Sequence, residues 1–269
     1  MLLPTIGNSI DQYYINFPWV AVADQNFRRA GEGQRATRTR GPLPVHMQIS
    51  ELLIREISSG RLADGARLPP ERDMAIDMGV AVGTLRRALL DLTEKGLLER
   101  IQGSGNYVRA NGDAVGVYAF FRLELTGGGG LPTAEMLAVE RIGKPKDIPS
   151  FGTSGHAHRI RRLRRLNGVA VALEEIWLDG ARAEHLDPAD ISESLYLHYR
   201  SALGFSVARI EDRVGIAPVP DWRPPAFSLS AGVAAGFIER ISWDGEDRSA
   251  EFSRSWFDPA LARYVARFR

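Results

Sequence analysis

Between residues 41 and 96, the hydrophobic positions recur at intervals of three and four, the spacing of helices that bury one face. QISELLIREISSG predicts a first helix with an inward face at Ile49, Leu52, Leu53 and Ile57. ERDMAIDMG predicts a short second helix, and VGTLRRALLDLTEKG predicts a third, with an inward face at Leu85, Leu89 and Leu92. A glycine ends each of these helices, at Gly60, Gly79 and Gly96.

Strand-like runs follow the third helix. LLERI and GNYVRA are rich in β-forming residues and are joined by QGSG, which predicts a hairpin. Three helices followed by a hairpin is the element order of a winged helix-turn-helix, and ANGD at 110–113 predicts a linker after it.

Beyond this linker, the hydrophobic positions favour strands that are bounded by Gly, Pro, Asp or Asn. The predicted strands are VYAFFRLEL, EMLAVERI, RIRRLRRL, VAVALEEIWL, ARIEDRVGIAPV, GFIERISWDG and SAEFSRSWF. DPADISESLYLHYRSALG predicts one or two helices with Asp190 or Ser192 as the N-cap, and GGGG at 127–130 predicts a flexible turn. The pattern therefore predicts a second, α+β domain with a mainly antiparallel sheet.

The amino-acid composition limits the kinds of bond and site that the chain can contain. The 269 residues include no cysteine, which excludes disulfides, zinc–thiolate sites and cysteine nucleophiles. No apolar run approaches the ~20 residues of a membrane span, and the first residues lack the pattern of a signal peptide. We therefore expect a cytoplasmic protein.

The net charge is only +1, so any affinity for nucleic acid depends on where the charges lie. Residues 41–110 hold nine Lys/Arg and nine Asp/Glu. Residues 1–40 hold five Arg, all between Arg28 and Arg40. We interpret residues 1–40 as a disordered basic tail, with a basic arm that contacts DNA phosphates as the alternative.

Residues 41–108 carry a recognisable series of motifs: the GARLPPERDMA turn, the GTLRRAL helix and the GSGNYV hairpin. In this order they resemble the DNA-binding domain of the GntR family of bacterial transcription regulators. RIRRLRRLNGVAVALEEIWL, SLYLHYRSALG and ERISWDGEDRSAEFSRSWFDPALARYVARF are similar to the effector-binding (UTRA) domain of the HutC subfamily. The resemblance implies a winged helix-turn-helix over 41–110 and a chorismate-lyase-like antiparallel-sheet domain over 114–269.

The resemblance also implies how DNA is bound. The third helix of such a domain enters the major groove with its first turn against the base edges, and Arg suits guanine because its fork matches O6 and N7 together. The residues that we expect to contact DNA are Arg72, Gly83, Thr84, Arg86, Arg87, Gly103, Ser104, Gly105 and Asn106. The alternative is a solvated helix face in which Arg72 and Arg86 pair with Glu71 or Asp73. We interpret Arg55, Arg61 and Arg67 as ordinary surface.

Two departures from the family pattern stand at helix starts. Pro70 replaces the usual Ser before the second helix, and Ala81-Val82 replaces the usual Ser-Arg of the third. Loss of an N-cap costs ~0.5–2 kcal/mol, and loss of a base-reading Arg removes ~1–3 kcal/mol of discrimination. These departures predict an altered operator, with Val82 making only apolar contact to a base.

RIRRLRR at 159–165 supplies cations for a ligand site. On a strand, Arg162 and Arg164 share one face, while Arg159, Arg161 and Arg165 share the other. The resemblance implies that Arg162 and Arg164 clamp an anionic group, and that Glu174 joins them, or Glu175 if the register differs by one. It also places Glu251 and Ser253 on an inward-facing strand. The FGTSG loop at 151–155 is a candidate source of backbone donors. The alternative for the arginine run is a solvated face or a dimer surface.

The resemblance implies a transcriptional regulator of repressor type that binds a pseudo-palindromic operator as a homodimer, because one winged module reads a half-site. Its effector would be small and anionic, as is common in the family. The alternative is an enzyme of chorismate-lyase-like fold tethered to nucleic acid by its first domain. We identify no catalytic residues, no cofactor and no metal site, since His156 and His158 lack a nearby third ligand and are expected at the surface.

Overall fold

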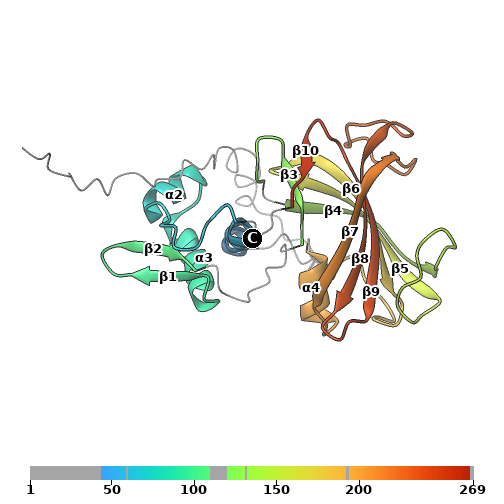
Figure 1. Ribbon diagram of the computed structural model, residues 1–269, viewed down its shortest axis with the longest axis horizontal. Helices are drawn as coiled ribbons and strands as arrows, with labels where there is room; N and C mark the ends of the chain where they lie inside the picture. The colour runs from blue at the N-terminus through green and yellow to red at the C-terminus, as the bar shows by residue number, and fades with distance from the viewer. Residues whose placement is uncertain (1–43, 59, 110–119, 131, 192–193, 267–269) are drawn as a thin grey trace, which may run out of the picture.

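The computed structural model describes residues 44–58, 60–109, 120–130, 132–191 and 194–266. The predicted tail over 1–40 and the linker over 110–113 lie outside the described residues. Two units of secondary structure lie side by side, with helices and a hairpin in the first and a long twisted sheet in the second (Figure 1).

The first unit has the predicted order of three helices and a hairpin. Its elements are α1 (Val45–Ser58), α2 (Glu71–Asp77), α3 (Val82–Glu94), β1 (Leu98–Ile101) and β2 (Gly105–Val108). All seven predicted inward-facing residues are buried in a single core cluster. The glycines that follow the helices adopt positive φ, at Gly60, Gly79 and Gly96. The periodicity therefore predicted this unit correctly.

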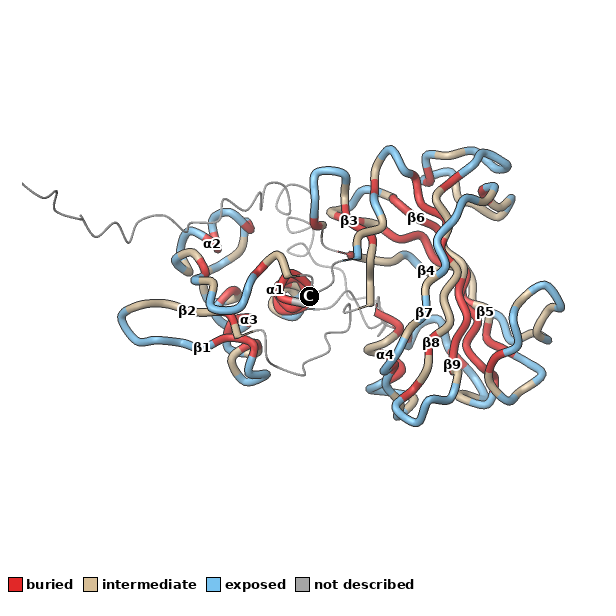
Figure 2. Tube along the Cα trace, in the orientation of Figure 1, coloured by how far each residue is buried: buried red, intermediate tan, exposed pale blue. Residues whose placement is uncertain are grey.

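The second unit contains a six-stranded antiparallel sheet in the order β4-β5-β6-β9-β8-β7. Its strands are β4 (Pro132–Gly143), β5 (His156–Leu166), β6 (Val169–Asp179), β7 (Val207–Pro218), β8 (Ala234–Asp244) and β9 (Ser249–Phe257). Two short strands, β3 (Leu123–Leu125) and β10 (Ala262–Tyr264), pair separately. Burial concentrates along the inner strands of the sheet and in the helices (Figure 2). The predicted α+β class with an antiparallel sheet is confirmed.

One helix, α4 (Leu195–Ala202), packs on a face of this sheet. Its N-cap is Ser194, whose Oγ accepts a hydrogen bond from the Leu197 backbone N–H at 3.3 Å. The prediction of Asp190 as a cap is wrong because the helix begins five residues later, and Ser192 lies outside the described residues.

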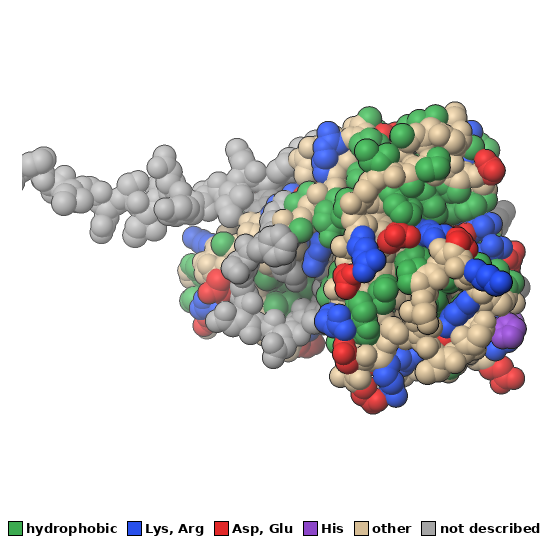
Figure 3. Space-filling model, turned by 45° about the vertical axis from the view of Figure 1, so that its right-hand side comes forward, with side chains coloured by type: hydrophobic (Ala, Val, Ile, Leu, Met, Phe, Trp, Pro, Cys, Tyr) green, Lys and Arg blue, Asp and Glu red, His purple; other side chains and the backbone are tan. Residues whose placement is uncertain are grey.

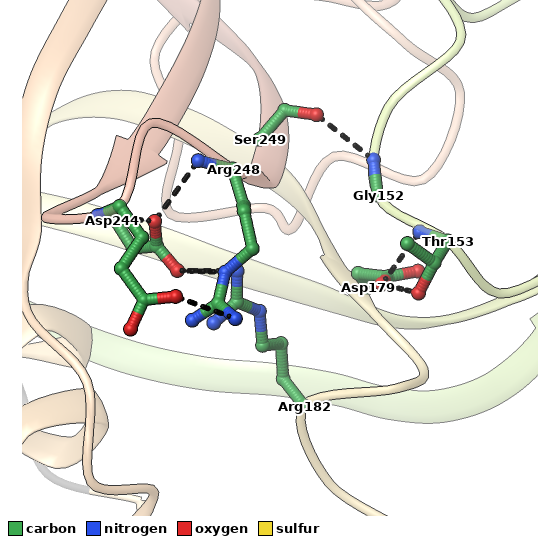
Figure 4. Close-up of polar contacts among 8 residues, drawn as sticks. Gly152, Thr153, Asp179, Arg182, Asp244, Arg248 and Ser249 are labelled. Carbon is green, nitrogen blue, oxygen red and sulfur yellow. Dashed lines mark hydrogen bonds and ion pairs between the residues drawn. The ribbon is translucent and has the colours of Figure 1, made fainter.

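Two buried carboxylates, Asp179 and Asp244, are the last residues of β6 and β8 at one end of the sheet (Figure 4). Asp179 accepts hydrogen bonds from the backbone N–H groups of Thr153 and Ser154, at 3.0 and 3.1 Å. A Cβ at Gly152 would collide with the Asp179 carboxylate, and φ of Gly152 is +62°, so the turn requires glycine. The backbone donors of the 151–155 loop are therefore used inside the fold, contrary to the hypothesis that they serve an effector.

The two units meet where the end of α1 contacts β3 and the turn at 127–130. Arg55 is buried and donates to the Leu123 and Gly130 carbonyl oxygens. Arg61 pairs with Glu124 of β3 at 3.3 Å. The prediction that both arginines are ordinary surface is wrong, because the second unit covers the polar side of α1.

Candidate DNA-binding surface and effector pocket

The first candidate site is formed by α2, the start of α3 and the wing. Arg72, Arg86 and Arg87 are exposed, and Thr84 is half-buried at the start of α3. A groove runs between the segment 67–71 and the wing segment 100–106. Of the predicted DNA-contacting residues, the four wing residues line this groove, and Arg86 is hydrogen-bonded to Glu71 at its edge. Contact of the predicted residues with bases or phosphates stays a prediction.

The wing is shaped by its glycines. Gly103 has φ +75° and Gly105 has φ +135°, and a Cβ on Gly105 would lie 3.3 Å from Arg67 Nε. Ser104 Oγ and Tyr107 Oη are 2.7 Å apart, which ties the tip to the strand. Asn106 is buried, and its carbonyl oxygen accepts from the Leu68 N–H at 2.9 Å. Asn106, one pair from the turn of the hairpin, therefore attaches β2 to the segment before α2, whereas Gly103 is exposed.

Glu71 holds Arg86 in the unbound protein. Glu71 Oε2 accepts from Arg86 Nε at 2.6 Å, and Arg100 Nη2 lies 3.8 Å from Glu71 Oε1. The Arg86 side chain is nevertheless 63% exposed, so this pair is screened and weak. The pairing that we considered as an alternative to DNA contact is present, in a form that a phosphate or a base could replace.

Both unusual helix starts lack a side-chain cap. Pro70 and Ala81 occupy the N-cap positions with extended backbones, at φ −52°, ψ 137° and φ −67°, ψ 140°. The Ala81 carbonyl still accepts from the Thr84 N–H at 2.9 Å. Val82 is half-buried and packs against the core of the domain. Packing from inside therefore holds the start of α3, and at least part of Val82 faces away from the groove.

The second candidate site is a pocket on one face of the six-stranded sheet, beside α4. All five predicted effector residues line it, namely Arg162, Arg164, Glu174, Glu251 and Ser253. Arg162 and Glu174 are cross-strand neighbours on β5 and β6. Glu174 Oε2 accepts from Arg162 Nη2 at 2.7 Å and from Arg164 Nη2 at 3.0 Å. One carboxylate thus orients two guanidinium groups.

The other arginines of the run point to the opposite face. Arg161 Nε donates to Glu175 Oε2 at 2.8 Å, and Arg165 Nη2 donates to Glu135 Oε2 at 3.2 Å. Arg159 pairs with Glu140 there. Figure 3 shows basic and acidic side chains intermixed on the surface of this unit. The period of two was therefore predicted correctly, and the choice between Glu174 and Glu175 falls on Glu174.

Burial sets the electrostatics of the pocket. Burial alone would raise the pKa of Glu174, but the charges of Arg162 and Arg164 outweigh it and hold the pKa at about 2. Burial lowers the pKa of Arg162. Arg164 Nη1 is buried without a hydrogen-bond partner among the described residues. It is a donor that an entering ligand could satisfy.

Glu251 lies deeper, against α4. Its carboxylate accepts from Tyr199 Oη at 2.6 Å and from Ser242 Oγ at 3.1 Å, with Tyr196 Oη at 3.3 Å. Burial raises the pKa of this carboxyl group despite these donors and the nearby arginines. Glu251 is the pocket group that most readily takes up a proton.

Several lining residues were not predicted from sequence: Phe121, Ser194, Tyr196, Arg240 and Ser255. Arg240 stands opposite Ser253 on neighbouring strands and binds Asp212 through two hydrogen bonds of 2.6 and 2.7 Å. The sequence did contain a signal for Arg240. Ile238, Arg240 and Ser242 alternate along β8, so they share one face of the strand, which is the face of the pocket.

Within the described residues, no group of three or more His, Asp or Glu side chains is placed to hold a metal ion. His156 is exposed, as predicted. His158 is buried, and its Nε2 lies 2.8 Å from the Ala183 carbonyl oxygen, so the prediction that it is a surface residue is wrong. In the described part of the chain, no helix is long and apolar enough to cross a membrane.

A winged helix-turn-helix joined to a domain with an arginine-lined pocket defines a ligand-responsive DNA-binding protein. Residues 46–108 match the family described as bacterial regulatory proteins, gntR family, and residues 128–261 match the UTRA domain. The chain belongs to the GntR family, carries the UTRA domain of its HutC-like members, and is a DNA-binding transcriptional regulator rather than an enzyme.

Two relatives that are similar in sequence agree with this assignment. The chain is 54% identical over 231 residues to the HTH-type transcriptional regulator SmoD of Agrobacterium fabrum, covering 86% of this chain and 99% of that protein. It is 24% identical over 221 residues to the HTH-type transcriptional repressor NagR of Bacillus subtilis, covering 80% and 91%. The solved structure of YydK from Bacillus subtilis aligns with 84% of this chain and all of that chain, at 17% identity and a TM-score of 0.48.

Proposed function

We propose that this regulator represses its genes by binding a pseudo-palindromic operator in the cytoplasm, and that a small anionic metabolite in the pocket releases it. The supporting observation is that Arg162 and Arg164 share one carboxylate, so their group has an excess of one positive charge. Arg164 Nη1 also offers a buried donor without a partner in the described structure. Arginine forks suit carboxylate, phosphate and sulfonate groups.

The experiment begins with selection of a binding sequence from random DNA by the purified full chain. A thermal-shift screen of phosphorylated sugars, phosphonates and amino-acid catabolites then identifies the effector, and fluorescence anisotropy measures operator release. Arg164→Gln should abolish the ligand shift, whereas Arg165→Gln, at the half-buried neighbouring position on the opposite face of β5, should keep it. Turnover of the metabolite without operator release, or an equal loss in both variants, would contradict the proposal.

The operator proposal requires two DNA-binding units, because one winged module reads a half-site. The outer edge of β7 supports a homodimer, since Val214 and Ile216 are 53% and 78% exposed there. In an antiparallel two-fold pairing centred on Asp212, Glu211 of one copy would face Arg213 of the other, and Ile210 would face Val214. The two Asp212 carboxylates would face each other at the centre, each already bound by Arg240 of its own copy. On either side of them, this match of charge and apolarity is what a self-complementary interface needs.

A further inference from the structure

Arg55 is a DNA-domain residue that is held almost entirely by the other domain. Its Nη1 donates to the Gly130 carbonyl oxygen at 2.8 Å, and its Nη2 donates to the Leu123 carbonyl oxygen. The side chain is 4% exposed. Burial lowers its pKa to about 10, so it remains charged at neutral pH. A buried cation that depends on these carbonyl groups makes the contact between the two units specific in geometry.

A second arginine fixes the same contact. Arg61 Nε and Nη2 donate to Glu56 of α1 at 2.5 and 2.9 Å, and Arg61 Nη1 lies 3.3 Å from Glu124 of β3. A Cβ on Gly128 or Gly129 would lie 2.9 or 2.5 Å from the Arg61 guanidinium nitrogens. The glycine turn therefore has a packing function, since it provides the space in which Arg61 lies.

The aromatic ring of Phe121 joins this contact to the pocket. The Arg55 guanidinium carbon lies 5.0 Å from the ring centroid, and the Arg164 guanidinium carbon also lies 5.0 Å from it. Phe121 and Leu123 both line the pocket that contains Arg164. One ring thus interacts with a cation of the pocket and with a cation of α1, and each interaction depends on where the ring stands.

We propose that Phe121 is the positioning residue through which the state of Arg164 in the pocket sets how α1 of the DNA-binding domain is held. The proposal rests on the proposed function, since it supplies the link between effector pocket and operator affinity. An anion that draws the Arg164 guanidinium toward itself weakens the contact of Arg164 with the ring. The ring then holds Arg55 differently, and α1 with it. Ligand and DNA would thus favour different arrangements of the same contact.

A double-mutant cycle in the full chain tests this link without a ligand. The measurement is hydrogen exchange of the α1 amides, residues 45–58. Arg164→Gln should change their exchange rate about twofold to fivefold, the range expected for one cation–π contact. In the Phe121→Leu background the same substitution should have a clearly smaller effect on α1, because only the direct repulsion between Arg164 and Arg55 remains. An equal change in both backgrounds, or no change in α1, would overturn the proposal.

Trp222→Leu provides the matched control. The Arg161 guanidinium carbon lies 4.8 Å from the centroid of the Trp222 ring. This is the same kind of cation–π contact, but it does not involve α1. In this background, Arg164→Gln should affect α1 as it does in the wild type. If Phe121→Leu fails to fold, Arg55→Lys replaces it, because lysine lacks the planar fork that stacks on the Phe121 ring. The effect of Arg164→Gln on α1 exchange is then compared between the wild type and Arg55→Lys.

Inorganic phosphate separates failure of the pocket from failure of the link. Phosphate should raise the Tm of the wild type and of Phe121→Leu but not of Arg164→Gln, and should alter α1 exchange clearly more in the wild type than in Phe121→Leu. If phosphate shifts no Tm, the anionic effector site is contradicted, while the double-mutant cycle still tests the connection from Arg164 through Phe121 to α1. If phosphate binds and alters α1 equally in the wild type and in Phe121→Leu, the pocket stands and the role of Phe121 is refuted.

Discussion

Arg162 and Glu174 face each other across β5 and β6, and the Arg162 Nη2 group donates to Glu174 Oε2 at 2.7 Å within the sheet. Both side chains are largely buried, and Arg164 binds the same oxygen. Removal of the carboxylate would therefore leave two like charges together with little water to screen them.

We predict that Glu174→Gln lowers the free energy of unfolding by about 3–5 kcal/mol, the cost of breaking a buried ion pair. Urea unfolding followed by circular dichroism measures it. Glu135→Gln is the control, because Glu135 pairs with Arg165 on the exposed face of the same sheet and should cost less than about 1 kcal/mol. Similar losses for both variants would mean that the pocket pair is well solvated.

The same carboxylate predicts a response to acid. The folded-state pKa of Glu174 is about 2, below the ordinary value of about 4.3. A depressed carboxyl pKa stabilises the fold fully above the unfolded-state value, and this stabilisation disappears as pH falls through the folded-state value. The wild type should thus lose stability relative to Glu174→Gln between about pH 4.5 and pH 2. Urea midpoints of the two proteins that fall in parallel would contradict this assignment.

We predict that Glu71→Gln strengthens DNA binding about twofold to fivefold at low salt, within the range of one exposed charge interaction. The substitution removes the negative charge beside Arg86, whose Nε donates to Glu71 Oε2 at 2.6 Å. Anisotropy titration with the selected DNA measures the change. Glu99→Gln, which disrupts the exposed pair with Arg109 on the wing strands, is the comparison variant. Weaker binding by Glu71→Gln would show that Glu71 instead positions Arg86 for DNA.

We predict that Ala81→Ser raises the free energy of unfolding by about 0.5–2 kcal/mol. The Ala81 backbone has the extended conformation of an N-cap but provides no side-chain acceptor. Ser194→Ala, at the N-cap of α4, should lower stability by a similar amount because it removes the acceptor of the Leu197 N–H. Thermal and urea unfolding measure both. No gain from serine at position 81 would mean that Val82 packing leaves no room for the cap.

We predict that Ile216→Asp converts the proposed dimer to a monomer and weakens operator binding, because it places a charge on the β7 edge. Light scattering after size-exclusion chromatography measures the mass. Val169→Asp, a charge at another exposed apolar position, should leave the dimer intact. A monomeric wild type, or a dimer that survives Ile216→Asp, would refute the proposed interface.

Local periodicity predicted the helices, the long strands and the faces of β5, because each depends on residues close in sequence. It could not choose between Glu174 and Glu175, since that choice depends on the pairing of β5 with β6. Arg55 shows that local periodicity also cannot predict burial by residues that are distant in the sequence. It occupies a polar position of an amphipathic helix, and its burial results from Leu123 and Gly130, which lie far along the chain. Arg240 was missed for the same reason, as its pocket neighbours come from other strands.

The contact between α1 and the sheet domain consists largely of arginine side chains on one side and of main-chain carbonyl groups and glycines on the other. In the receiving segment, this contact depends on few side chains, chiefly Phe121 and Glu124. The rest of the pocket lining can therefore diversify toward new effectors without a matching change in the DNA-binding domain. Chimaeras that retain Arg55, Arg61 and the segment 121–130 should yield regulators that keep their DNA-binding domain and respond to a different effector.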